Sequence, residues 1–236
     1  MIAAALMMRF TAARPGAEFV QIGASDGVSF DPLRPHIQRG GWSGVLVEPL
    51  PYMFERLREA YEGNQRIRLF QVAVAAEPGR RTIHYVDPER IADGSVSGIA
   101  PWAEQVASFD RAHVLANLGP ADDPDSLLAE VEVECVTLAE LLAEAGIESP
   151  DLIMVDAEGA DAEIVRSIDF GRCRPRLIVF EHEHLDASEQ AACEELLRDQ
   201  GYELVADGLD TWALDTIPDD DLSRGWLEEI ERRRAP

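Results

Sequence analysis

Phe19-Val-Gln-Ile-Gly-Ala-Ser-Asp-Gly27 is the stretch that decides the fold of this chain. Its apolar run, Phe19 to Ile22, breaks at Gly23 into a loop of small residues that Gly27 closes. A buried strand passes into a nucleotide-binding turn in this way, because glycine lets the backbone bend sharply and approach a ligand closely. The loop departs from the dinucleotide fingerprint G-x-G-x-x-G, since it lacks the second glycine and carries the acid Asp26.

A second acid, Glu48, follows the apolar run Gly44-Val-Leu-Val47. At the end of the second strand of a Rossmann-type fold, an acid accepts hydrogen bonds from the ribose hydroxyls of a cofactor. A carboxylate at Asp26 would repel a phosphate but attract an ammonium or a sulfonium ion. S-adenosyl-L-methionine carries both cations and no phosphate. The two acids together therefore favour a site for this cofactor.

Composition and charge limit the class of protein. The 236 residues suit one α/β domain, residues 1–236, with 46% hydrophobic residues and a mean hydropathy of −0.14. The net charge of −24 disfavours nucleic acid and anionic membranes as partners. The cysteines Cys135, Cys173 and Cys193 lack metal-ligand spacing and are expected to be reduced thiols. The apolar start, Met1 to Met8, is too short to span a bilayer and lacks a basic leader, so a cytoplasmic location is expected.

Strands and helices alternate along the chain, which predicts a doubly wound sheet. The expected strands cover residues 19–22, 45–47, 68–74, 82–86, 152–155 and 177–180, and residues 202–205 and 212–214 form an antiparallel pair. The expected helices are a short one that Asp31 caps and that ends at Gly40-Gly41, and those at about 51–61, 138–145 and 187–200. Residues 87–129 break the alternation. They form either a lid over the substrate, with Trp102, Phe109 and His113 in its pocket, or an ordered surface excursion.

Ligands of open α/β sheets bind beyond the carboxyl ends of the strands, so the residues just past each expected strand define the candidate site. On the cofactor side these are Gly23, Ala24, Ser25, Asp26, Gly27, Glu48, Pro49, Ala73 and Val74. On the catalytic side they are Asp156, Glu158, Glu181 and His182. Any single acid of this set could instead cap the following helix.

The run Glu181-His182-Glu183-His184 contains metal-binding residue types. Alternation along a strand would send residues 181 and 183 to one face and residues 182 and 184 to the other, so these ligands would not converge. Asp156 with a neighbour could still supply a magnesium site, because hard cations take oxygen ligands. We expect no required metal and assign acid–base or positioning roles to these residues.

Three segments resemble the FkbM-type family of S-adenosylmethionine-dependent methyltransferases. They are the stretch from Phe19 to Gly27, the stretch Gly41-Trp-Ser-Gly-Val-Leu-Val-Glu-Pro49, and Pro150-Asp-Leu-Ile-Met-Val-Asp-Ala-Glu-Gly159 with its acid-x-Glu-Gly motif. Thr137-Leu138 before a helix, Glu181 after an apolar strand and Gly201-Tyr202 are also similar to the family pattern. The resemblance extends over residues 19–214.

This resemblance implies the class I methyltransferase fold, a mostly parallel seven-stranded Rossmann-like sheet with helices on both faces. It implies methylation of a hydroxyl on a sugar, polyketide or other secondary metabolite. Gly23, Asp26, Gly27 and Glu48 would hold the cofactor, and Asp156, Glu158 and Glu181 would face the reacting centre. Ala139 departs from the pattern, since the family usually carries an acid directly after the Thr-Leu pair.

The sequence therefore predicts an O-methyltransferase that uses S-adenosyl-L-methionine and a small-molecule acceptor, with no signal for a particular oligomeric state. His182 is the natural base near neutral pH, and Asp156 or Glu181 could serve if desolvation raised its pKa. Two alternatives remain open. One is a methyltransferase-like module that binds but no longer catalyses. The other, which the loop at Asp26 disfavours, is a nicotinamide-dependent oxidoreductase.

Overall fold

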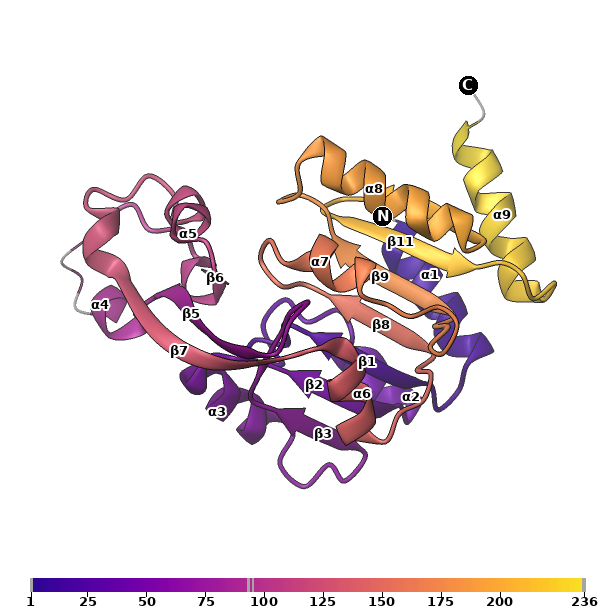
Figure 1. Ribbon diagram of the computed structural model, residues 1–236, viewed down its shortest axis with the longest axis horizontal. Helices are drawn as coiled ribbons and strands as arrows, with labels where there is room; N and C mark the ends of the chain where they lie inside the picture. The colour runs from indigo at the N-terminus through magenta and orange to yellow at the C-terminus, as the bar shows by residue number, and fades with distance from the viewer. Residues whose placement is uncertain (1, 93, 95, 235–236) are drawn as a thin grey trace.

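The computed structural model describes residues 2–92, 94 and 96–234, and a seven-stranded sheet forms its centre (Figure 1). The strands are β1 (Glu18–Ile22), β2 (Ser43–Val47), β3 (Ile67–Phe70), β8 (Leu152–Val155), β9 (Leu177–Glu181), β10 (Tyr202–Asp207) and β11 (Asp210–Asp215). Their order is β10-β11-β9-β8-β1-β2-β3, and all of them run in the same direction except β11, which is antiparallel to both β10 and β9. The strand order reverses between β1 and β8. The expectation of a mostly parallel, doubly wound sheet is confirmed.

Helices cover both faces of this sheet (Figure 1). One face carries α1 (Ile2–Ala13), α2 (Arg34–Gly40), α3 (Pro51–Ala60) and α9 (Asp221–Arg234). The other carries α6 (Leu138–Ala145), α7 (Asp161–Arg166) and α8 (Ala187–Asp199). The alternation of side chains along β1 matches the two layers, because Phe19 packs with the first group of helices and Val20 and Ile22 pack with the second.

Several helix boundaries follow the capping residues. Thr137 and Glu140 form a capping box at the start of α6, and Asp186 and Glu189 form another at α8, as local sequence rules require. The expected short helix begins later than Asp31. The Asp31 side chain accepts hydrogen bonds from the Leu33 and Arg34 amides, at 2.8 and 3.3 Å, and this turn delays the start of α2 to Arg34.

Residues 68–74, which were expected to form one third strand, instead form parts of two strands that belong to different sheets. β3 ends at Phe70, and β4 (Ala73–Val74) pairs with Cys135 and Val136 of β7 (Leu128–Val136) in a second sheet. Gln71, which interrupts the apolar residues Leu69 to Val74, lies where the chain changes partner, but a single polar residue does not by itself predict such a change. Because the strand is interrupted after Phe70, Ala73 and Val74 leave the edge of the central sheet and line a cleft beside it.

The second sheet has the order β4-β7-β5-β6, with β5 (Gly79–Val86) and β6 (Ala107–Ser108), and it forms a lobe with its own helices (Figure 1). The lobe also contains α4 (Pro88–Ala92), η1 (Ala103–Gln105), α5 (Arg111–Asn117) and η2 (Pro124–Leu127). A small core that includes Val86, Val114, Leu118 and Leu127 holds these elements together. The described residues of the segment 87–129 therefore form short helices and strands around a core of their own. Its elements are too short to produce a visible hydrophobic period.

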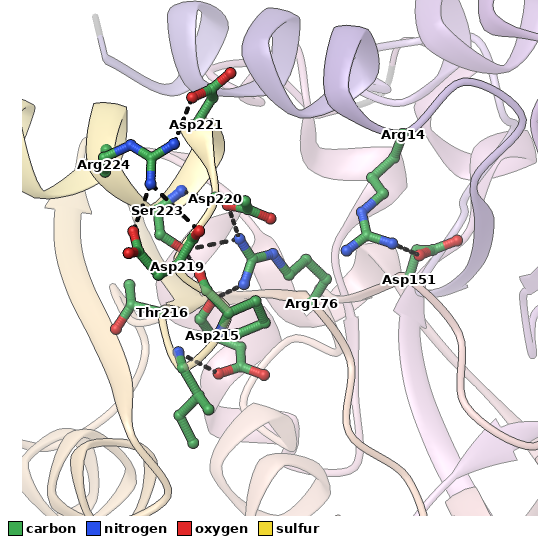
Figure 2. A network of polar contacts seen from close by, with 12 residues as sticks. Arg14, Asp151, Arg176, Asp215, Thr216, Asp219, Asp220, Asp221, Ser223 and Arg224 are labelled. Carbon is green, nitrogen blue, oxygen red and sulfur yellow. Dashed lines mark hydrogen bonds and ion pairs between the residues drawn. The ribbon is translucent and has the colours of Figure 1, made fainter.

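A polar network at the amino-terminal edge of the sheet fastens α9 to the core (Figure 2). The buried Arg176 donates to Asp220 at 2.6 Å, to the Ser223 hydroxyl at 2.8 Å and to the carbonyl of Asp215. Within the described residues, no helix is long and apolar enough to cross a membrane. The three cysteines are buried and unpaired with one another.

Candidate functional site

A cleft of about 760 Å³, its open mouth included, lies beyond the carboxyl ends of β1, β2 and β8. This is the place where ligands of open α/β sheets bind. Of the residues expected from the sequence, those that line it are Gly23, Ser25, Glu48, Pro49, Ala73, Val74, Asp156 and Glu158. The second sheet closes one side of the cleft with Ile83, Gln105, Ala107, Ser108 and Phe109. Ala24, Asp26, Gly27, Glu181 and His182 lie outside this lining.

Glu48 is the best-defined side chain of the cleft. Its Oε2 accepts a hydrogen bond from the Ser25 amide at 2.9 Å, and its Oε1 accepts one from the Leu50 amide at 2.8 Å. Burial raises the pKa of Glu48 to about 7, although both hydrogen bonds favour the ionised form. Each carboxylate oxygen can still accept another donor. Glu48 is thus held in one orientation and can bind a pair of hydroxyl groups.

The backbone of the loop after β1 packs closely against the loop after β8. Gly23 has a φ of +81°, and a Cβ atom there would lie 1.7 Å from the carbonyl oxygen of Asp156. Gly27 is less restricted, since a Cβ there would lie 2.4 Å from Cδ1 of Leu57, which is the end of a flexible side chain, although its φ of +67° also favours glycine. Glycine is therefore required at Gly23 for the contact across the site and is favoured at Gly27.

Asp26 shapes the loop from within. Its Oδ1 accepts from the amides of Val28 and Ser29 at 2.8 and 2.7 Å, and its Oδ2 accepts from the Ser29 hydroxyl at 2.7 Å. Burial opposes ionisation of Asp26, but these hydrogen bonds outweigh it and lower the pKa. The carboxylate is therefore a fixed negative charge that stabilises the turn. Ala24 is buried in the core beside it.

Acidic side chains crowd the catalytic side. Asp156 is exposed to the cleft but surrounded by protein, and this desolvation raises its pKa well above the ordinary value, with Asp161 and Glu158 adding to the effect. Burial, followed by the charge of Asp156, raises the pKa of Glu181 to about 9. Burial also raises the pKa of Asp161 to about 7 and that of Asp210 to about 6. Near neutral pH Glu181 therefore retains its proton and Asp161 is partly protonated, whereas Asp210 is mostly ionised.

Two histidines contact Glu158. Nε2 of His113, from α5 of the second lobe, lies 2.8 Å from Oε2 of Glu158, and Nε2 of His184 lies 3.7 Å from the same oxygen. The two imidazole rings are 4.4 Å apart and nearly perpendicular. Burial lowers the pKa of His184, and the nearby His113 lowers it further. The hydroxyl of Ser108 donates to the Glu158 carbonyl at 2.7 Å, a second link between lobe and core.

The histidines differ from the sequence expectation. His182, the expected base, lies outside the lining of the cleft, and its Nδ1 is 3.0 Å from the Thr211 hydroxyl. His184 turns toward Glu158 because β9 ends at Glu181 and the chain turns, so strand alternation does not continue through residue 184. Of the residues expected in the 87–129 pocket, Phe109 lines the cleft and His113 reaches Glu158, whereas Trp102 is 54% exposed and does not line it.

Asp161 was not expected from the sequence. Its carboxylate is buried and accepts from the Ala157 amide at 3.2 Å, which fixes the loop that carries Asp156 and Glu158. The sequence offers one signal for this residue, because Asp161 is an acid three residues after Glu158 and lies in the first turn of the next helix.

Comparison with known proteins identifies the family to which the chain is similar. The family described as the methyltransferase FkbM domain matches residues 21–204. The 31-O-demethyl-FK506 methyltransferase FkbM of Streptomyces tacrolimicus is 30% identical over 204 residues, which cover 82% of this chain and 75% of that protein. The 2-O-methyltransferase NoeI of Sinorhizobium fredii (strain NBRC 101917 / NGR234) is 29% identical over 157 residues, which cover 64% of this chain and 57% of that protein.

A solved structure gives the same fold. The methyltransferase FkbM from Methylobacillus flagellatus KT superposes with a TM-score of 0.52 at 12% identity, over 90% of this chain and 47% of that chain. This chain thus spans about half the length of that protein. The family match covers both loops that shape the cleft, with Glu48 and the acid-x-Glu-Gly motif inside it. The chain therefore belongs to the FkbM family of methyltransferases.

Proposed function

We propose that this protein transfers a methyl group from S-adenosyl-L-methionine to a hydroxyl of a small-molecule acceptor. The observation that carries the proposal is Glu48, a buried carboxylate at the end of β2 that two backbone amides hold toward the cleft. A ribose with two free hydroxyls fits this acceptor pair. Family membership supports methyl transfer as the reaction.

The residues present fit the proposed cofactor. Gly23, Ser25, Glu48, Pro49, Ala73 and Val74 would surround it, and the carboxylate of Asp26 would act through the loop that it stabilises. Among the described residues that line it, this side of the cleft has acids and apolar side chains but no lysine or arginine. Such an environment suits a cationic, phosphate-free ligand better than a dinucleotide.

S-adenosyl-L-methionine supplies a methyl group on a positively charged sulfur atom. The chain's own residues then have two tasks, to align the acceptor oxygen with that group and to take the hydroxyl proton. Asp156 opens into the cleft, and its raised pKa makes its ionised form a stronger proton acceptor than an ordinary carboxylate. The transfer therefore requires the fraction of protein in which Asp156 has lost its proton, and its rate should rise with pH. We propose Asp156 as the base and Glu158 as an orienting group, with Glu181, which lies outside the cleft lining, acting through its charge interaction with Asp156. His182 lies outside the cleft lining and receives no role.

The acceptor is proposed to bind on the side closed by the second lobe, which residues 87–129 largely form. Ser108 and Phe109 line the cleft from this lobe, together with residues of the loops after the strands of the core sheet. The names of both relatives above describe transfer to oxygen, and one of them names a demethylated small molecule as its substrate. These observations support a hydroxylated small molecule as the acceptor class.

A screen of hydroxylated small molecules with methyl-labelled cofactor tests this proposal. We expect one acceptor to gain the mass of a single methyl group, with release of one S-adenosylhomocysteine per product. Protein that binds the cofactor but transfers no methyl group to any member of a broad panel would favour the alternative of a binding module without catalysis.

A further inference from the structure

Three side chains from separate parts of the chain converge beside the cleft. His113 comes from α5, Glu158 from the loop after β8, and His184 from the turn after β9. One nitrogen of each imidazole and one carboxylate oxygen all lie within 4.8 Å of one another. The oxygen is Oε2 of Glu158, which is 2.8 Å from Nε2 of His113 and 3.7 Å from Nε2 of His184. We call this set the His-Glu-His cluster.

The cluster is largely shielded from water. The side chains of His113, His184 and Glu158 are 12%, 18% and 22% exposed. A fourth group lies next to them, because Oε2 of Glu181 is 3.5 Å from Nε2 of His184. This oxygen is buried and has no hydrogen-bond partner in the described structure. A buried carboxylate oxygen without a donor is costly unless another positive group satisfies it.

From this geometry we infer that His113, Glu158 and His184 form a binding site for a divalent transition-metal ion, with Glu181 as an additional oxygen donor. Two imidazoles and a carboxylate suit zinc, cobalt, iron or nickel, whereas magnesium and calcium prefer oxygen donors alone. Zinc–nitrogen bonds of about 2.1 Å in tetrahedral geometry separate neighbouring ligand atoms by about 3.4 Å. The spacings of 2.8 and 3.7 Å bracket that value, so small side-chain movements are sufficient.

A metal at this cluster would join the two lobes. His113 belongs to the second lobe and the other ligands belong to the core, so the ion would hold the 87–129 segment against the cleft. Glu158 also lines the cleft, so the ion would lie at its wall. A role of the ion in orienting the acceptor hydroxyl rests on the proposed function. Binding of the ion to the His-Glu-His cluster does not depend on that function.

The test measures binding directly, without cofactor or acceptor. Untagged protein is freed of metal with a chelator and titrated with Co²⁺, whose visible absorption reports coordination, and with Zn²⁺ by competition. We expect one equivalent to bind. His113→Gln and His184→Gln should each weaken binding roughly tenfold or more. X-ray absorption of the zinc-loaded wild type should show scattering from two imidazoles, a readout that does not depend on any variant folding.

His84→Gln is the matched control. His84 is also half-buried and lies 3.2 Å from the carboxylate of Glu130, but among the described residues this pair does not belong to a three-ligand cluster. It should bind the ion as the wild type does. Failure of the wild type to bind Co²⁺ and Zn²⁺, equal affinity in both cluster variants and the wild type, or zinc without imidazole ligands would each overturn the inference. None of these results depends on whether the protein transfers methyl groups.

Discussion

Replacing Glu48 with glutamine removes the charge of the proposed ribose contact while keeping its size. The glutamine amide has one oxygen, so it cannot accept from both the Ser25 and Leu50 amides as the carboxylate does. A hydrogen bond to a charged group contributes about 1.5–3 kcal/mol. We therefore expect Glu48→Gln to weaken binding of S-adenosyl-L-methionine by roughly one to two orders of magnitude.

The pH dependence of cofactor affinity provides a second, independent signature of Glu48. Ribose hydroxyls donate to the ionised form, and burial raises the pKa of Glu48 to about 7 without ligand. Wild-type affinity should therefore be level above pH 7 and fall below it, by up to about tenfold per pH unit. In Glu48→Gln this dependence should disappear.

Calorimetric titration at pH 6 and pH 8 measures both effects. Glu140→Gln is the matched control, since Glu140 also accepts a backbone hydrogen bond, from Thr137 at 2.8 Å, but lies outside the cleft. It should leave the affinity unchanged at both pH values. Affinity in Glu48→Gln within twofold of the wild type would refute the assignment of Glu48 to the ribose.

Four further outcomes are expected. Asp156→Asn should lower kcat 10²–10⁴-fold with little change in cofactor Kd, as single-turnover rates beside calorimetry would show, and Glu181→Gln should lower kcat less because Glu181 lies outside the cleft lining. Gly23→Ala should cost roughly 2–5 kcal/mol in urea unfolding, because its Cβ would overlap the Asp156 carbonyl at a positive φ. Burial raises the pKa of Asp161 from 3.8 to about 7, so the contribution of the protonated side chain to the stability of the fold is complete below pH 3.8 and is lost as the pH rises through 7. The Tm of the metal-free protein should therefore fall over this range, and it should fall less in Asp161→Asn. Arg176→Ala should cost about 1–3 kcal/mol in the same unfolding assay, since the buried Ser223 hydroxyl and Asp215 carbonyl lose their donor, whereas Asp220 is 42% exposed and can be solvated.

The sequence predicted the core sheet well because its signals are local. Apolar runs ending in glycine or an acid marked β1, β2, β8 and β9, and the capping pair Thr137 and Glu140 marked the start of α6. The carboxyl ends of parallel strands meet at one edge, so the residues after these strands could be placed near one another without knowing any contact. Most of the expected cleft residues lie there.

The second lobe was not predictable in the same way. Its sheet forms when β5 pairs with β7, more than forty residues later in the chain, and β4 leaves the path of β3 to join it. Long-range pairing of this kind leaves no periodic pattern in short elements. The position of His113 depends on this lobe, and that of His184 depends on a turn that ends a strand one residue after its apolar run. Both residues are therefore visible as a cluster only in the folded structure.

The most direct test of the central claim is one calorimetric comparison of three ligands on the wild-type protein. S-adenosyl-L-methionine and S-adenosylhomocysteine should each bind at one site per chain with micromolar-range affinity, and NAD should give no saturable binding. Saturable binding of NAD together with no binding of either sulfur compound would contradict the account.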